Sequence, residues 1–214
     1  MKITCGLLCV AFGLFLGAPQ SKASTSFCAG NPNNLIGNCA FGTGDFTDWT
    51  VTGNDTPGEA GNLYGVETGA DPVDGIIPPN GDTNQAFFAD LVANSTTIAE
   101  TLNTTPGVIY TIEFYMAQDT TPGTGTAPNS NQLVLSFGGT TVTTLTATPV
   151  QGYTFYKFTG TATGAFSVVS FTIGNDLGET LLDDISVTTP EPSTWMLMGA
   201  GLLGLAFVAR KRTA

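Results

Sequence analysis

The acid–base chemistry open to this chain is carboxylate chemistry, because it has 17 Asp and Glu residues and no histidine. Without histidine the chain lacks the commonest general base and the commonest zinc ligand. This excludes a Ser-His-Asp triad, a Cys-His pair and an HExxH zinc site within the chain. The chain also has only 6 Lys and Arg residues and a formal charge of −11. Phosphate recognition rests on basic side chains, so we expect no nucleic-acid partner.

Two carboxylates can hydrolyse a glycosidic bond if they flank it and one has a raised pKa. The acidic residues here stand in no recognisable motif of that kind, and Asp71, Asp74 and Asp82 fall in predicted loops. We interpret them as solvated charges that favour solubility. They also lack the alternating spacing of an EF-hand calcium loop. Pro78-Pro79 stiffens the same segment, which we expect to be an insertion near the rim of the fold. From the absence of a catalytic motif we expect that the protein is not an enzyme.

A sugar-binding surface needs exposed aromatic faces and a few polar groups that orient hydroxyls. Two predicted strands carry such residues at outward positions: Glu113 and Tyr115 on one, Phe155 and Lys157 on the other. If the two strands share a sheet, these four side chains form one surface for a ligand. The alternative is that the aromatic residues only pack at a sheet edge beneath a loop.

Short runs of β-forming residues, separated by Gly, Thr, Asn and Pro, predict an all-β sandwich or jelly roll. In one strand Tyr110, Ile112, Phe114 and Met116 alternate with more polar residues, which indicates a strand covered on one side. Gly138-Gly139 suits a two-residue hairpin turn with positive φ. The predicted strands are 35–39, 49–52, 63–67, 86–91, 97–102, 108–117, 132–137, 140–145, 154–159, 167–173 and 181–188.

The basic residues lie almost entirely at the two ends of the chain, whereas residues 24–189 hold sixteen acids and one base, Lys157. At the N-terminus, Lys2, an uncharged apolar run and small residues around Ala23 are typical of a secretory signal. We therefore expect residues 1–23 to be a signal peptide, forming a helix before cleavage, and residues 24–189 to be one exported domain.

At the C-terminus, residues 193–209 form an uncharged and mostly apolar run, just long enough for a transmembrane helix. Arg210, Lys211 and Arg212 follow it and would stay on the cytoplasmic side as a basic stop. Pro190, Glu191 and Pro192 precede it, and the two prolines keep that segment extended and accessible.

The order Pro-Glu-Pro-Ser, apolar helix and terminal basic cluster resembles the PEP-CTERM sorting signal over residues 190–212. The resemblance implies that an exosortase in the membrane recognises Pro190, Glu191 and Pro192 and cuts there. It implies a protein anchored transiently in the inner membrane of a Gram-negative bacterium and then moved to the cell surface or beyond. A plain tail anchor with an incidental Pro-Glu-Pro is the alternative.

Of four cysteines, Cys5 and Cys9 leave with the signal peptide, so the exported domain keeps Cys28 and Cys39. Two cysteines without histidine in an exported domain favour one disulfide over a metal site. A redox-active pair would have Cys-x-x-Cys spacing, which is absent here. We expect a Cys28–Cys39 bridge that ties the N-terminus to the first strand.

The segment 34–49, NLIGNCAFGTGDFTDW, resembles the opening of exported jelly-roll domains related to carbohydrate-binding modules, and 182–187 is similar to their final strand. The resemblance implies a galactose-binding-like jelly roll. In many relatives a Glu after the first Phe and an Asp in the last strand hold a structural calcium. Here Gly42 replaces that Glu, and only Asp184 matches. Asp184 therefore has two possible roles: it binds a calcium ion, or it forms hydrogen bonds at the end of a strand.

Together these features predict an exported surface or extracellular-matrix protein, processed by an exosortase, with weak carbohydrate binding and no catalysis. Its expected partners are the exosortase, the membrane before processing, and an exopolysaccharide. One alternative is a purely structural component of a biofilm matrix. Another is a polysaccharide hydrolase that depends on two carboxylates.

Overall fold

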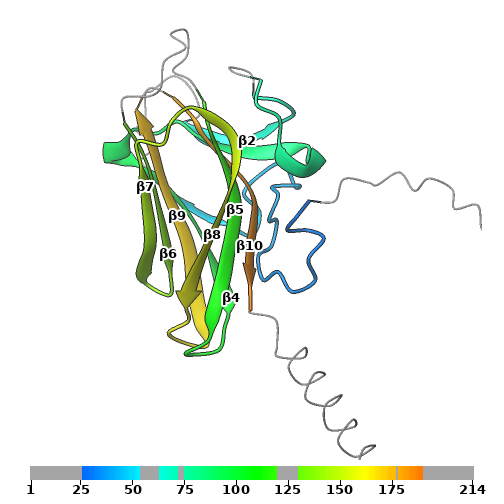
Figure 1. Cartoon of the computed structure of the whole chain (residues 1–214), viewed down its shortest axis with the longest axis vertical. Helices are drawn as coiled ribbons and strands as arrows, with labels where there is room; N and C mark the ends of the chain where they lie inside the picture. Colours follow the sequence, from blue (N-terminus) through cyan, green and yellow to red (C-terminus); the bar gives the residue numbers. More distant parts are fainter. Residues whose placement is uncertain (1–25, 54–62, 72–74, 120–129, 177, 190–214) are drawn as a thin grey trace, which may run out of the picture.

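Figure 1 shows the computed structural model, which describes residues 26–53, 63–71, 75–119, 130–176 and 178–189. These residues form ten strands and two short 3-10 helices. The strands are β1 (Thr50–Thr52), β2 (Tyr64–Thr68), β3 (Asn84–Phe88), β4 (Thr96–Asn103), β5 (Ile109–Gln118), β6 (Ser130–Phe137), β7 (Thr140–Thr146), β8 (Gln151–Thr161), β9 (Phe166–Asp176) and β10 (Thr180–Thr188), and the helices are η1 (Pro79–Gly81) and η2 (Val92–Asn94).

The strands form two five-stranded sheets, which pack against each other as a sandwich (Figure 1). The first sheet has the order β1-β4-β9-β6-β7 and the second the order β2-β3-β10-β5-β8. All pairings in both are antiparallel. Consecutive strands lie in different sheets except for β2–β3 and β6–β7, so the chain crosses repeatedly between the sheets, as in jelly rolls. The all-β sandwich prediction is confirmed.

The two predicted terminal helices, the signal helix and the transmembrane helix at 193–209, lie outside the described residues. Within the described part of the chain, no helix has both the length and the apolar character of a membrane span.

The core lies between the sheets because strand residues alternate between two faces. In β5, Tyr110, Ile112, Phe114 and Met116 are at most 2% exposed, as the alternation predicts. Rings from the two sheets meet there, since the centroids of Phe114 and Phe171 of β9 are 5.2 Å apart with the rings edge to face. The side chains of the residues between them on β5 therefore lie on the outward face of the second sheet, where they can contact a ligand.

The predicted hairpin between β6 and β7 is confirmed. Gly138 and Gly139 link Phe137 to Thr140, which are the last partners of the ladder. Their φ angles of 59° and 82° lie in the left-handed region, which glycine enters without steric cost.

The N-terminal segment, residues 26–49, is irregular, and the predicted strand at 35–39 is wrong. The segment runs beside β10 (blue in Figure 1), with backbone hydrogen bonds from Leu35 N to Val187 O and from Ile185 N to Cys39 O, both at 2.9 Å. The Asn34 side chain takes the next ladder position, since its Oδ1 accepts from Val187 N at 2.9 Å and from Ile36 N at 3.2 Å. Side-chain bonds of this kind compete with a strand ladder.

Contacts to both sheets hold this segment in place. Cys28 and Cys39 form a disulfide with their Cα atoms 6.0 Å apart. The N–H of Gly37 donates to Glu100 Oε1 of β4 at 3.0 Å. The rings of Phe41 and Trp49 lie 6.2 Å apart and are buried in the core. The segment thus closes one side of the sandwich.

The described residues between β2 and β3, 69–71 and 75–83, which we call the β2–β3 loop, fold back over the second sheet. The carbonyl of Ile76 accepts from Asp71 N at 2.7 Å and from Gln85 Nε2 of β3 at 3.3 Å. Asp71 is 2% exposed as a result. The interpretation of Asp71 as a solvated charge is therefore wrong; Asp82 is half-buried, and Asp74 lies outside the described residues.

We predict that replacing Cys28 and Cys39 together by serine lowers the free energy of unfolding by about 3 kcal/mol, because the open chain regains loop entropy in the unfolded state. Urea unfolding under oxidising conditions measures the difference. A reducing agent should lower the stability of the wild type to that of the variant and leave the variant unchanged. Equal stabilities of both proteins before reduction would contradict this prediction.

Glu100 provides a prediction about pH. Burial raises the pKa of its carboxyl group from 4.5 to about 7, and the hydrogen bond from Gly37 N only partly offsets this effect. The folded protein therefore binds this proton more tightly than the unfolded chain. The resulting stability is complete below about pH 4.5 and disappears as the pH rises through about 7.

Glu100→Gln keeps the acceptor for Gly37 N but cannot ionise. We therefore expect the variant to gain stability relative to the wild type as the pH rises from about 4.5 to about 7. Urea unfolding at a series of pH values gives this difference. Two parallel stability curves would refute the assignment.

Candidate functional site

The four residues predicted as a ligand surface lie side by side on the outward face of the second sheet. In the ladder between β5 and β8, Glu113 stands directly opposite Lys157, and Tyr115 directly opposite Phe155. Each pair is two residues from the other along its strand, so all four side chains share one face. The structure therefore brings these residues together, although they are about forty positions apart in sequence.

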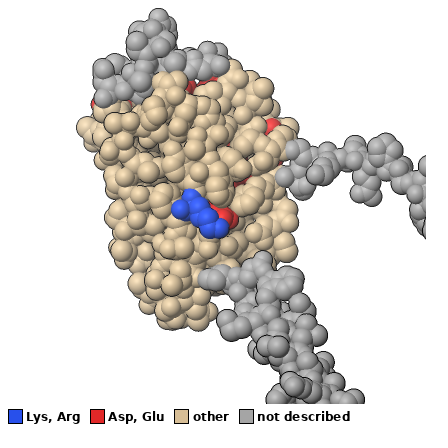
Figure 2. Space-filling view, viewed as in Figure 1, with Lys and Arg blue, Asp and Glu red and all other residues tan. Residues whose placement is uncertain are grey.

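Glu113 and Lys157 form an ion pair, with Lys157 Nζ 2.7 Å from Glu113 Oε1. The Lys157 side chain is 60% exposed, whereas that of Glu113 is 13% exposed. Figure 2 shows this pair as a blue patch next to a red one on a surface that is mostly uncharged. An exposed pair of this kind adds little stability, but it offers donors and an acceptor at the surface.

Phe27 of the N-terminal segment joins the two aromatic residues. Its ring centroid lies 6.4 Å from that of Tyr115 and 5.8 Å from that of Phe155, both edge to face. Tyr115 and Phe155 are 5.3 Å apart. Phe155 is still 43% exposed. We call these five residues (Phe27, Glu113, Tyr115, Phe155 and Lys157) the β5–β8 strip.

Sequence reasoning missed Phe27, because nothing in the sequence places it on β5 and β8. The one available signal is its position beside Cys28, whose disulfide fixes the segment. The edge-to-face contacts are also what the alternative of edge packing requires, and Phe155 alone keeps a large exposed face.

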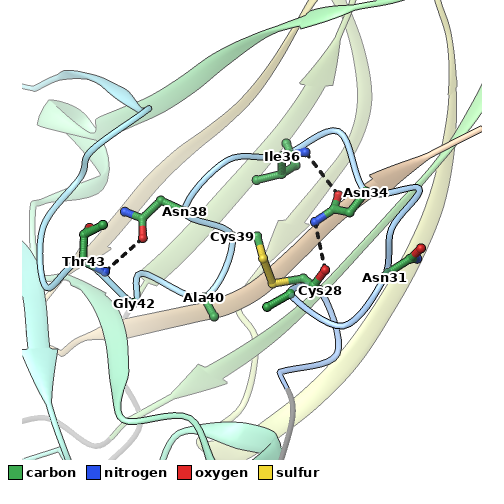
Figure 3. A pocket seen from close by; sticks show the side chains of 10 residues that line it. Cys28, Asn31, Asn34, Ile36, Asn38, Cys39, Ala40, Gly42 and Thr43 are labelled. Carbon is green, nitrogen blue, oxygen red and sulfur yellow. Dashed lines mark hydrogen bonds between the residues drawn. A yellow bond between two sulfur atoms is a disulfide. The ribbon is translucent and has the colours of Figure 1, made fainter.

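A groove of about 440 Å³ surrounds the disulfide and is lined mainly by small residues and asparagines (Figure 3). Its polar groups already have partners within the chain. Asn38 Nδ2 donates to Asp45 O at 2.8 Å and its Oδ1 accepts from Thr43 N at 3.2 Å. Asn34 Nδ2 donates to the carbonyl of Cys28 at 3.4 Å. Few donors or acceptors therefore remain for a ligand, and the β5–β8 strip is the better candidate.

Asp184, the residue implied as a calcium ligand, lies in a bulge of β10 and has a φ of 54°. Its carboxylate accepts from the Ser26 hydroxyl, from Phe27 N at 3.3 Å, from Cys28 N at 3.2 Å and from Asn80 Nδ2 at 2.5 Å. These four groups direct hydrogen atoms toward the carboxylate, and a cation in the same place would repel them. Gly42, at the position of the second expected calcium ligand, supplies no carboxylate. The residues around Asp184 therefore suit a hydrogen-bonded carboxylate better than a calcium ion.

Next to it, Asp183 is fully buried. Burial raises the pKa of its carboxyl group to about 9, and the charges of Asp184 and Asp82 add to this effect. Burial and Asp184 likewise raise the pKa of Asp82 to about 6. At neutral pH the carboxyl group of Asp183 is therefore protonated. The carboxyl group of Asp184 is stabilised by the hydrogen bonds that it accepts.

The predicted sorting residues Pro190, Glu191 and Pro192, and the basic residues Arg210, Lys211 and Arg212, lie outside the described residues. The PEP-CTERM protein-sorting motif matches residues 188–212, which confirms the resemblance of this segment. No curated protein matches the chain.

Several solved structures are similar to the sandwich. The enzymatically active domain of tailspike protein 4 of bacteriophage CBA120 has a TM-score of 0.51 at 12% identity over 74% of this chain. The match covers 22% of the tailspike chain. The carbohydrate-binding module TmCBM61, in complex with β-1,4-galactotriose, has a TM-score of 0.49 at 15% identity, with 73% of this chain and 99% of that chain covered.

A family 35 carbohydrate-binding module from Clostridium thermocellum has a TM-score of 0.45 at 12% identity, with 68% of this chain and 95% of that chain covered. At such identities the likeness concerns the fold. The chain is thus a jelly-roll β-sandwich that leads directly into a PEP-CTERM sorting motif.

Proposed function

We propose that this is an exported protein that an exosortase processes, and that its sandwich binds carbohydrate weakly through the β5–β8 strip without catalysis. The observation that carries the binding proposal is the strip itself. It joins an exposed ring, that of Phe155, to a donor and an acceptor from Lys157 and Glu113. This combination of aromatic face and polar groups is the one that sugar recognition requires.

In the proposed complex, the apolar face of a sugar ring stacks on Phe155, and the Glu113–Lys157 pair contacts hydroxyl groups. The domain has sixteen acids and Lys157 as its one base. An acidic polysaccharide would be repelled everywhere except near Lys157. We therefore propose a neutral exopolysaccharide as the ligand. Only one aromatic face is freely exposed, which is why the binding is weak.

Hydrolysis is disfavoured by the position of the acids near the strip. Glycoside hydrolysis uses two carboxylates that flank the bond to be cut. On the strip, Glu113 is the one carboxylate, and it is paired with Lys157. Asp183, the neighbour of Tyr115 in the ladder, is fully buried. A substrate on the strip would thus meet one available carboxylate.

The sorting proposal follows from the PEP-CTERM motif. The motif match begins at Thr188, which is also the last residue of β10. Recognition at Pro190, Glu191 and Pro192 would therefore occur just outside the sandwich. In this proposal residues 193–209 anchor the protein in the inner membrane, the basic residues at 210–212 stay in the cytoplasm, and cleavage moves the sandwich to the cell surface or the extracellular matrix.

Carbohydrate binding is tested with the protein purified after export. We expect binding of a neutral exopolysaccharide in affinity gel electrophoresis, and Phe155→Ala should weaken it about tenfold, which corresponds to about 1.4 kcal/mol. Phe166→Ala is the matched control, because Phe166 is 67% exposed on β9 of the other sheet. No binding at millimolar sugar, or equal losses in both variants, would reject the strip. Loss of biofilm cohesion on deletion of the gene would then favour the structural matrix role.

The sorting proposal has a separate test. Alanines in place of Pro190, Glu191 and Pro192 should leave the protein in the membrane fraction instead of the medium or cell surface, because the exosortase loses its recognition element. Thr189→Ala, one residue earlier and exposed, is the control and should be processed normally. Unchanged release of the triple variant, followed by fractionation and immunoblotting, would exclude this role of the tripeptide.

A further inference from the structure

Three acidic side chains from distant parts of the chain meet at one end of the second sheet. Asp71 lies in the β2–β3 loop, Asp119 directly follows β5 and Glu179 directly precedes β10. One carboxylate oxygen of each lies within 4.8 Å of the other two. Asp71 and Asp119 are 2% and 0% exposed, so this group is removed from water. We call it the acidic triad.

An independent feature points into the same space. Asn175, near the end of β9, is fully buried, and its Oδ1 has no hydrogen-bond partner among the described residues. A Cβ placed on Gly178 would lie 3.2 Å from this Oδ1 and 3.2 Å from Asp119 Oδ1. The amide oxygen and the carboxylate therefore face a common space beside Gly178. A buried amide oxygen without a donor is costly unless something occupies that space.

The described residues include one basic side chain, and it lies elsewhere. Lys157 is the only base between residues 24 and 189, and its Nζ is 2.7 Å from Glu113 on the β5–β8 strip. Burial raises the pKa of Glu179 to about 8, and the charges of Asp119 and Asp71 add to the effect. A bound cation would favour the charged form of Glu179 and would also give the amide oxygen a partner.

We propose that Asp71, Asp119 and Glu179 bind a calcium ion, with Oδ1 of Asn175 as a further ligand. All four donors are oxygens, which hard cations prefer, and the triad contains neither of the ligands that zinc favours, histidine or cysteine. Calcium–oxygen distances of about 2.4 Å allow ligands on opposite sides of the ion to be about 4.8 Å apart. Magnesium, at about 2.1 Å, would need the triad to contract.

The ion would link the β2–β3 loop to the end of β5 and the start of β10, which already pair with each other in the ladder. Glu179 is already held there, since its N–H donates to Asp119 Oδ1 at 2.5 Å and its carbonyl accepts from Gln118 Nε2 at 2.7 Å. Water would complete the six to eight ligands that calcium takes. The site is separate from Asp184, whose carboxylate accepts four hydrogen bonds.

The test uses the protein purified after export and freed of metal with a chelator. Calcium at millimolar concentration should raise the melting temperature by about 5 °C, and magnesium at the same concentration should raise it less. Glu179→Gln should abolish the calcium shift. Glu100→Gln is the matched control, since Glu100 is also a half-buried glutamate with a raised pKa, but on the opposite sheet. It should keep the full shift.

Two results would overturn the proposal. One is a wild type whose melting temperature does not respond to calcium. The other is a calcium shift that Glu179→Gln retains and Asp184→Asn removes, which would place the ion at Asp184. If Glu179→Gln fails to fold, Asp119→Asn replaces it, because its amide oxygen still accepts from Glu179 N. Calcium affinity from isothermal titration calorimetry then decides: a loss of at least tenfold supports the site, and an unchanged affinity rejects it.

Discussion

A carboxylate that leaves water must gain a proton, hydrogen-bond donors or a cation. This constraint governs the second sheet, because the domain has sixteen acids and one base. Four groups of acidic residues there illustrate it. Glu113 pairs with Lys157. Asp184 accepts hydrogen bonds from Ser26, Phe27, Cys28 and Asn80. Asp183 has a pKa raised to about 9 and is protonated, and the acidic triad is where we infer an ion.

The hydrogen bonds that Asp184 accepts also position the β5–β8 strip. Its carboxylate binds the backbone N–H groups of Phe27 and Cys28, and the disulfide from Cys28 holds the same turn. Phe27 is thereby placed against Tyr115 and Phe155. A buried carboxyl group in β10 thus determines the shape of an outward aromatic surface on β5 and β8. Loss of Asp184 would therefore disturb the strip without any change in the strip's own residues.

The sequence predicts the parts of this structure that follow from local pattern. The alternation in β5 identifies its core face, and Gly138-Gly139 identifies a hairpin turn, because both depend on near neighbours. The four strip residues were also predictable, given that β5 and β8 are adjacent. The rest depends on long-range contacts. The sequence does not show that Asp71 is buried, because its burial depends on the fold of the β2–β3 loop over the sheet. The predicted strand at 35–39 is wrong because the Asn34 side chain, and not the backbone, binds to β10 at that position.

The position of β10 explains how the proposed processing site can lie so close to the fold. β10 lies between β3 and β5 in the second sheet, and Thr180 to Val187 are buried. Thr188 still pairs with Thr111 of β5 and with Asn34. A central strand that is bonded to its last residue does not need the chain beyond it. Pro190, two residues later, has no N–H to donate to a ladder. The proposed cut at the tripeptide would leave the sandwich complete and remove the basic end, to which we assign a role in membrane delivery.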